Sequence, residues 1–189
     1  MSPQLVIYLL WLLWAMSWFA ASFWSRPTHK HASLKENLIQ RLVVLLGVVL
    51  LFGLYSPRPL ALHSLWVLPD LWGWVMAALV LLGFAWCWWA RIHLGQLWSS
   101  NVGRKADHHV VESGPYAVVR HPIYTGIILA SLATATELGT MAAMAGAAIM
   151  TVGWTIKARM EENFLRAELG PAYDAYAERV AMLVPFAKR

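Results

Sequence analysis

The chain has 189 residues, of which 59% are hydrophobic and only 13% are charged, and it contains twelve tryptophans. A soluble domain is nearer half apolar and a quarter charged, so this composition favours a membrane protein. The single cysteine, Cys87, excludes an internal disulfide and a cysteine-based metal site. The net charge of +5 is better explained by membrane topology and anionic lipid than by binding to nucleic acid.

Apolar stretches predict an all-α integral membrane protein with about five transmembrane helices. The expected spans are residues 5–24, 42–55, 71–90, 123–136 and 140–156. The first and third contain about twenty residues, enough to cross a hydrocarbon layer of ~30 Å. The first is too long for a signal peptide and follows no charged segment, so we expect it to remain as a helix. A polar segment, 25–40, separates the first two spans.

The last two spans are predicted to form a short, tight helical hairpin, because only Glu137-Leu138-Gly139 separates them. Their many small residues allow membrane helices to pack closely. The tail, 157–189, is charged and amphipathic, and Gly170-Pro171 indicates the end of one helix and the start of another. We expect Tyr173 and Tyr176 to lie on protein or on the membrane surface. The whole chain, 1–189, is predicted to be one membrane domain, with three N-terminal spans over 1–90.

The basic residues predict the orientation of the spans. With five spans, every lysine and arginine except Arg58 falls on one side of the membrane. That side carries the polar segment 25–40, the central polar region and the tail. The positive-inside rule places that side in the cytoplasm and the N-terminus outside. We therefore expect an integral protein of a bacterial inner (cell) membrane, with a cytoplasmic C-terminus.

The central polar region contains the stretch HHVVESGPYAVVRHPIYTG, residues 108–126. Gly114-Pro115 is typical of a turn, and Pro122 favours extended backbone at His121 before an apolar helix begins. An Arg120-His121 pair at the mouth of a membrane helix is costly to bury in hydrocarbon. This stretch is therefore interpreted as a binding and reaction site.

The predicted hairpin brings its two open ends together. His121 precedes one arm, and the other arm continues into the sequence KARMEE, residues 157–162. We therefore expect His121 and Tyr124 to lie near Lys157, Arg159 and Glu161.

The motif SGPYAVVRHPIYTG, followed by the pair EE and then by LGPAYDAYAERVAMLVPF, resembles the isoprenylcysteine carboxyl methyltransferase family. It is similar also to related phospholipid methyltransferases. The resemblance covers roughly residues 91–186, and it implies a methyltransferase-like cofactor-binding core over 91–189. In that family S-adenosylmethionine, which becomes S-adenosylhomocysteine, lies in a cytoplasmic pocket closed by the C-terminal segment.

Matching positions imply a set of cofactor contacts: His108, His109, Val110, Val111, Tyr116, His121, Pro122, Tyr124 and Glu161. Asn101 stands where some members have Gln, and the backbone amides near Gly114 suit the cofactor's carboxylate. The family's substrate-orienting Arg falls on Lys157, with Arg159 two residues further on. We expect the catalytic set to be Arg120, Lys157 and Arg159.

The chemistry that the resemblance implies is methyl transfer to a lipidic acceptor, with an isoprenylcysteine-like carboxylate as the leading candidate. A carboxylate needs no general base, so the protein must align the reactants, which can lower the barrier by roughly 7–11 kcal/mol in ideal cases. It must also exclude water from the site. The expected partners are the bilayer and a lipidic or prenylated acceptor, whose identity and entry path the sequence leaves open, as it does the oligomeric state.

Other functions are weighed against this one. A phospholipid amine or thiol methyltransferase is an alternative acceptor class, and NADPH-dependent sterol reductases share a similar C-terminal layout. A non-catalytic membrane protein that only binds a ligand is a third possibility.

Simpler structural roles are also expected at several positions. Arg120 could be an interfacial arginine, and Glu162 is expected to pair with Arg166 or Arg159 on an exposed face. Glu137 is expected to flank the far hairpin turn. His108-His109 with a distant His121 has no metal-ligand spacing, so no metal is expected.

Overall fold

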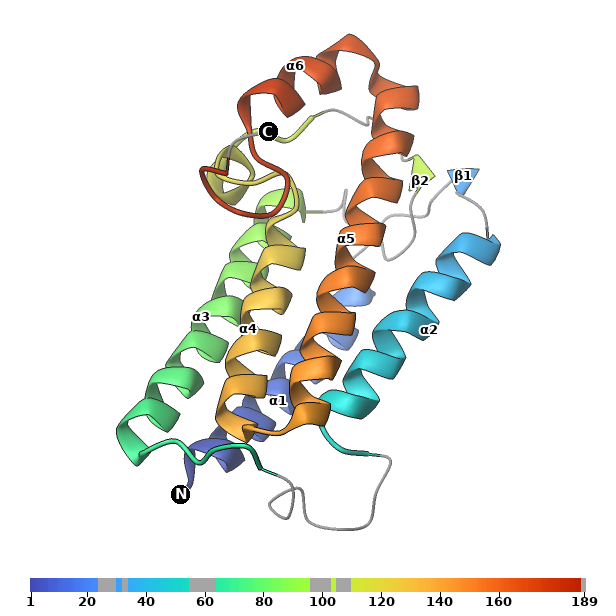
Figure 1. The fold of residues 1–189 in the computed structure, drawn as a ribbon. Coiled ribbons are helices and arrows are strands. Elements are labelled where there is room, and N and C mark those ends of the chain that lie inside the picture. Colours follow the sequence, from blue (N-terminus) through green and yellow to red (C-terminus); the bar gives the residue numbers. More distant parts are fainter. Residues whose placement is uncertain (24–29, 32–33, 55–63, 96–102, 105–109, 188–189) are drawn as a thin grey trace.

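The computed structural model describes residues 1–23, 30–31, 34–54, 64–95, 103–104 and 110–187. Among these residues, five long helices form a bundle and a shorter sixth helix lies across one end (Figure 1). The helices are α1 (Pro3–Ser22), α2 (Leu34–Leu51), α3 (Asp70–Leu94), α4 (Pro122–Leu138), α5 (Met141–Leu169) and α6 (Pro171–Arg179). The predicted helical fold class is therefore confirmed.

Two very short strands and one 3-10 turn complete the described structure. Strand β1 (Lys30–His31) pairs antiparallel with β2 (Gly103–Arg104). The 3-10 turn η3 (Gly114–Ala117) precedes α4. The strands thus link the segment before α2 to the central polar region.

Within the part of the chain that the structure describes, three helices, α1, α3 and α5, are long and apolar enough to cross a membrane. Two shorter apolar helical segments belong to the same bundle: Asn37–Leu51, which is most of α2, and Pro122–Leu138, which is α4. The 17 residues of α4 extend about 25 Å, slightly less than the hydrocarbon layer. The chain is therefore an integral membrane protein in which three long helices accompany two shorter ones.

The hairpin of α4 and α5 forms as predicted, and local chemistry sets its turn. Gly139 ends α4 in the left-handed region with φ 60°, where glycine is favoured. Thr140 then caps α5 by accepting a hydrogen bond from the Ala143 amide at 3.1 Å. Glu137 flanks this turn but is buried, and its carboxylate lies against Gly73 near the start of α3.

Helix α2 begins earlier than the sequence predicted. The expected span started at residue 42, whereas α2 starts at Leu34, inside the segment expected to be polar and outside the span. Most residues of this first part, such as Leu38 and Gln40, are good helix formers. Because α2 starts earlier, two polar side chains, those of Asn37 and Gln40, lie inside the bundle.

Glycines allow the helices to approach closely. A Cβ atom at Gly126 of α4 would lie 2.5 Å from the Gly83 carbonyl oxygen of α3. A Cβ atom at Gly146 of α5 would lie 2.6 Å from the Gly47 carbonyl oxygen of α2. Both distances are shorter than any real contact of this kind, so these pairs fix where α3 meets α4 and where α2 meets α5.

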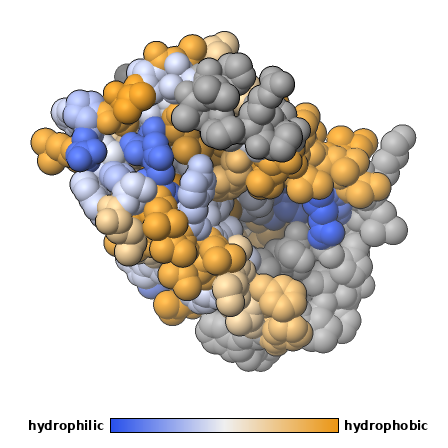
Figure 2. Space-filling model, turned by 90° about the horizontal axis from the view of Figure 1, so that it is seen from below, coloured by the Kyte–Doolittle hydropathy of each residue, from blue (hydrophilic) through white to orange (hydrophobic). Residues whose placement is uncertain are grey.

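The outer surface of the bundle is strongly apolar. Leu12, Leu13 and Val152 each expose more than half of their area, as expected for side chains that face lipid rather than water. Seen from the end that carries the N-terminus, hydrophobic residues cover much of the molecule and are interrupted by separate hydrophilic patches (Figure 2).

Candidate functional site

The open ends of α4 and α5 meet as the hairpin predicted. The Tyr124 hydroxyl donates a hydrogen bond of 2.6 Å to Glu161 Oε1. His121 Nδ1 lies 3.5 Å from Glu161 Oε2, and Lys157 Nζ lies 3.8 Å from Oε1. Residues from the start of α4 and from the C-terminal half of α5 thus converge on a single carboxylate.

His121 is held at the entrance of α4 by backbone geometry and stacking. It is the N-cap residue, with φ −123°, directly before buried Pro122. Its ring is parallel to that of Tyr124 at 5.6 Å, and Tyr124 stacks in turn on Trp154 at 4.9 Å. A column of three rings therefore fills the space between α4 and α5.

The protonation of His121 is controlled by two carboxylates. Burial alone would lower the pKa of His121, but Glu161 and Glu162 outweigh burial and raise the pKa above its ordinary value. The Nε2 atom lies 3.4 Å from Glu162 Oε1. The imidazole is thus biased towards its protonated form.

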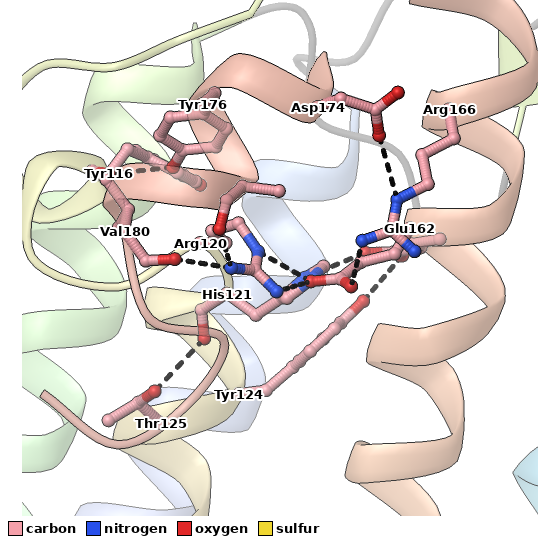
Figure 3. Close-up of polar contacts among 12 residues, drawn as sticks. Tyr116, Arg120, His121, Tyr124, Thr125, Glu162, Arg166, Asp174, Tyr176 and Val180 are labelled. Carbon is pink, nitrogen blue, oxygen red and sulfur yellow. Dashed lines mark hydrogen bonds and ion pairs between the residues drawn. The ribbon is translucent and has the colours of Figure 1, made fainter. Parts of the chain in front are cut away.

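Arg120 connects α5 to the end of α6 (Figure 3). Its Nε donates to Glu162 Oε1 at 2.7 Å, and one terminal nitrogen donates to the carbonyl oxygens of Ala177, at 2.9 Å, and of Val180. Both charged side chains are almost fully buried. Within the described residues the guanidinium is thus engaged by protein groups, and a catalytic role for Arg120 stays a prediction.

Glu162 is the residue that the sequence interpretation placed wrongly. It does pair with Arg166, at 3.7 Å, but it is only 5% exposed and its main partner is Arg120. The signal was available in the sequence, because adjacent basic residues, Arg120-His121, face adjacent acidic residues, Glu161-Glu162. Side chains of adjacent residues point in different directions. Each of the two acidic residues therefore needs its own basic partner.

The segment after α6 returns to the start of α4. The Arg120 amide donates to the Ala181 carbonyl oxygen at 2.8 Å, and the Thr125 hydroxyl donates to the Leu183 carbonyl oxygen at 2.6 Å. These bonds fasten the C-terminal segment over the ends of the hairpin.

Lys157 and Arg159 occupy different environments. Lys157 is 4% exposed, and its ammonium donates to Asn37 Oδ1 at 3.3 Å. Arg159 is exposed, and a separation of two residues turns it to about the opposite side of α5. The structure therefore brings Lys157, but not Arg159, to Glu161.

The turn η3 lies beside this cluster. Gly114 has φ +58°, and a Cβ atom there would collide with the His93 ring, so both backbone strain and space require glycine. Tyr116 is buried, and its carbonyl oxygen accepts a 2.7 Å hydrogen bond from the Tyr176 hydroxyl. Helix α6 is thereby tied to η3 as well as to Arg120.

The remaining predicted contacts are distributed around the cluster. Val110 packs against the buried tyrosines of α6, and Val111 packs against the main core. Asn101, His108 and His109 lie outside the residues that the structure describes.

Charge and exposure distinguish Glu161 from its neighbours. Its side chain is 21% exposed, whereas those of His121, Glu162 and Lys157 are between 5% and 7% exposed. An accessible carboxylate beside a stack of aromatic rings is suited to an organic cation, since both the negative charge and the ring faces attract it.

Comparison with known proteins adds independent information. Residues 75–167 match the isoprenylcysteine carboxyl methyltransferase (ICMT) family. Protein-S-isoprenylcysteine O-methyltransferase B of Arabidopsis thaliana is 34% identical over 85 residues, which cover 44% of this chain and 43% of the relative. The Schizosaccharomyces pombe Protein-S-isoprenylcysteine O-methyltransferase is 30% identical over 99 residues, covering 51% and 42%. A Pseudomonas methanethiol S-methyltransferase is 39% identical over 70 residues, covering 37% and 26%.

The chain spans less than half the length of the plant and yeast relatives. The family match begins within α3 and ends before α6, so it contains the hairpin and every member of the cluster around Glu161. Within residues 75–167, this chain matches the isoprenylcysteine carboxyl methyltransferase family and is similar to the plant and yeast methyltransferases named above.

Proposed function

We propose that this protein is an S-adenosylmethionine-dependent methyltransferase that acts on a lipidic acceptor, most simply by carboxyl O-methylation of an isoprenylcysteine-like substrate. The observation that carries the proposal is the environment of Glu161. This carboxylate is fixed by Tyr124 and faces His121 and Lys157, yet it remains partly exposed. The family match over the same residues supports the reaction class.

The residues present fit S-adenosylmethionine. Glu161 suits its ammonium group, and the rings of Tyr124 and Trp154 provide faces for a cationic or aromatic group. Backbone amides around Gly114 suit its carboxylate. When bound, the cofactor supplies the methyl group to be transferred.

The protein's own contribution is alignment and exclusion of water. Arg120 and Glu162 hold α6 and the segment after it against the hairpin, which covers the site. Lys157 offers a positive charge to the acceptor's carboxylate. A carboxylate acceptor is already charged, so no side chain has to remove a proton during the transfer.

The bilayer position follows from the same arrangement. The cluster lies at the end of the bundle opposite the α4–α5 turn and the N-terminus (Figure 1). We propose that this end is cytoplasmic, in a bacterial inner membrane, and that the acceptor enters sideways from lipid. This path would explain why an enzyme with a soluble cofactor is embedded in a membrane.

Ligand-dependent melting of the detergent-solubilised protein tests the proposal. A ligand at 100 times its Kd stabilises the folded state by about 2.7 kcal/mol, so S-adenosylmethionine and S-adenosylhomocysteine should each raise Tm. Stabilisation by NADPH alone would instead indicate a reductase. A protein that responds to none of the three would not be a methyltransferase.

Thiol methylation is the second candidate, because one relative is named a methanethiol S-methyltransferase. A radiolabelled methyl donor offered with a farnesylcysteine carboxylate, a phospholipid amine or an alkyl thiol distinguishes these acceptors. Transfer to the carboxylate is the expected result.

A further inference from the structure

In the first turns of α2, two polar side chains face the interior of the bundle and the neighbouring apolar side chains face outward. Asn37 and Gln40 are 6% and 5% exposed, whereas the adjacent Leu38 and Ile39 are 57% and 53% exposed. Buried amides are costly unless they form hydrogen bonds, so a helix that turns them inward must offer them partners. In a membrane protein such inward polar groups commonly mark a functional site.

The partners of both amides lie on one face of α5. Gln40 Nε2 donates to the Gly153 carbonyl oxygen at 3.4 Å, and Asn37 Oδ1 accepts from Lys157 Nζ at 3.3 Å. Asn37 and Gln40 are about one helical turn apart, as are Gly153 and Lys157, so the two helices match turn for turn.

Close packing holds the two helices in this register. A Cβ atom at Gly153 would lie 2.8 Å from Val44 Cγ2 of α2. One turn further along, the same interface contains the amides and the ammonium. The close contact between Gly153 and Val44 therefore also fixes the position of Asn37 relative to Lys157.

Lys157 gains a defined position but keeps its charge. An ammonium has three N–H donors; Asn37 Oδ1 accepts one of them, and Glu161 Oε1 lies at ion-pair distance, 3.8 Å from Nζ. Glu161 is shared with Tyr124 and His121. A neutral amide on α2 fixes the flexible lysine stem without neutralising it, which leaves the ammonium available to an anionic group.

We infer that Asn37, supported by Gln40, is a positioning residue that directs the Lys157 ammonium towards the anionic head group of the acceptor. This inference rests on the proposed function. It assigns a specificity role to α2, which lies outside the matched residues 75–167.

A double-mutant cycle with Asn37→Leu and Lys157→Met tests the inference on the full-length protein. N-acetyl-S-farnesylcysteine serves as the carboxylate acceptor and dodecanethiol as the neutral one. Asn37→Leu should raise KM for the carboxylate by about tenfold, the loss expected for a hydrogen bond to a charged group. It should change kcat, the Kd of S-adenosylmethionine and thiol methylation by less than about twofold.

The cycle separates positioning from a general structural effect. If Asn37 acts through Lys157, the double variant has the same KM as Lys157→Met alone. Additive effects, or an unchanged KM in Asn37→Leu, would overturn the inference. Leu38→Ala, at the neighbouring exposed position, is the matched control and should behave like the parent.

Two further results complete the test. If Asn37→Leu does not fold, Asn37→Asp serves as the second variant, because it keeps the shape of the side chain. It should also raise KM for the carboxylate acceptor, since an aspartate would neutralise the Lys157 ammonium. An unchanged KM would overturn the inference. A parent that binds S-adenosylmethionine but methylates neither acceptor would refute the proposed function and the inference together. That outcome differs from an active parent with an unresponsive Asn37→Leu, which refutes the inference alone.

Discussion

Glu161 connects the two arms of the hairpin. It accepts from Tyr124 on α4 and faces Lys157 one turn earlier on its own helix. A carboxylate so placed can bind a cation only if its charge is not fully compensated, and its partial exposure leaves one side accessible.

Replacing Glu161 with Gln tests this role. Loss of a charge-assisted hydrogen bond costs about 1.5–3 kcal/mol, so we expect the affinity for S-adenosylmethionine to fall about tenfold to a hundredfold in isothermal titration. The Tm of the ligand-free protein should change little, because glutamine keeps the shape of the side chain and one hydrogen-bond acceptor. Affinity equal to that of the parent would remove Glu161 from the cofactor site.

His121 should make stability depend on pH. Its folded-state pKa is raised above the ordinary value of 6.5 because the two carboxylates outweigh burial. The stabilisation is therefore complete below pH 6.5 and is lost as the pH rises through the folded-state pKa. The Tm difference between the parent and His121→Gln, measured from acidic to alkaline pH, should shrink on that rise. A difference that is independent of pH would contradict this account.

The closure by α6 depends on one buried ion pair. Arg120 is the common partner of Glu162 and of two carbonyl groups at the end of α6. Removing one partner of a buried pair leaves the other charge uncompensated, at a cost of about 3–5 kcal/mol.

Arg120→Ala should therefore lower the free energy of unfolding by about that amount and expose the C-terminal segment to limited proteolysis. The control is Arg179→Ala, which removes an ion pair of similar length, 2.7 Å to Glu112, at exposed positions. Exposed pairs contribute about 0–1 kcal/mol. Equal destabilisation by both substitutions would show that burial of the Arg120 pair is unimportant.

Much of the element arrangement could be predicted from the sequence. Apolar runs and turn residues such as Gly139 and Gly170 located the hairpin and the start of α6, and the hairpin placed His121 beside Glu161. The start of α2 could not be predicted, since Asn37 and Gln40 appear as solvated loop residues until α5 supplies their partners. The adjacent acidic and basic pairs did indicate a partner for Glu162, but the contact of Arg120 with the end of α6, which helps to bury them, could not be predicted.

For the whole molecule, the orientation in the membrane can be tested with single cysteines. Cys87 is fully buried and should not react. We expect a membrane-impermeant maleimide to label Met141→Cys, at the α4–α5 turn, in intact cells. Glu178→Cys, on exposed α6, should be labelled only after lysis. The reverse pattern would invert the proposed topology.

The bonds from Ala181 and Leu183 back to the start of α4 have a consequence for biosynthesis. All five long helices precede these carbonyl groups in the chain, so each of them is synthesised before the contacts can form. A variant truncated before residue 181 would keep the long helices but lose both bonds to the start of α4. The last few residues of the chain are thus required to complete the proposed site, although they contribute nothing to the helices that surround it.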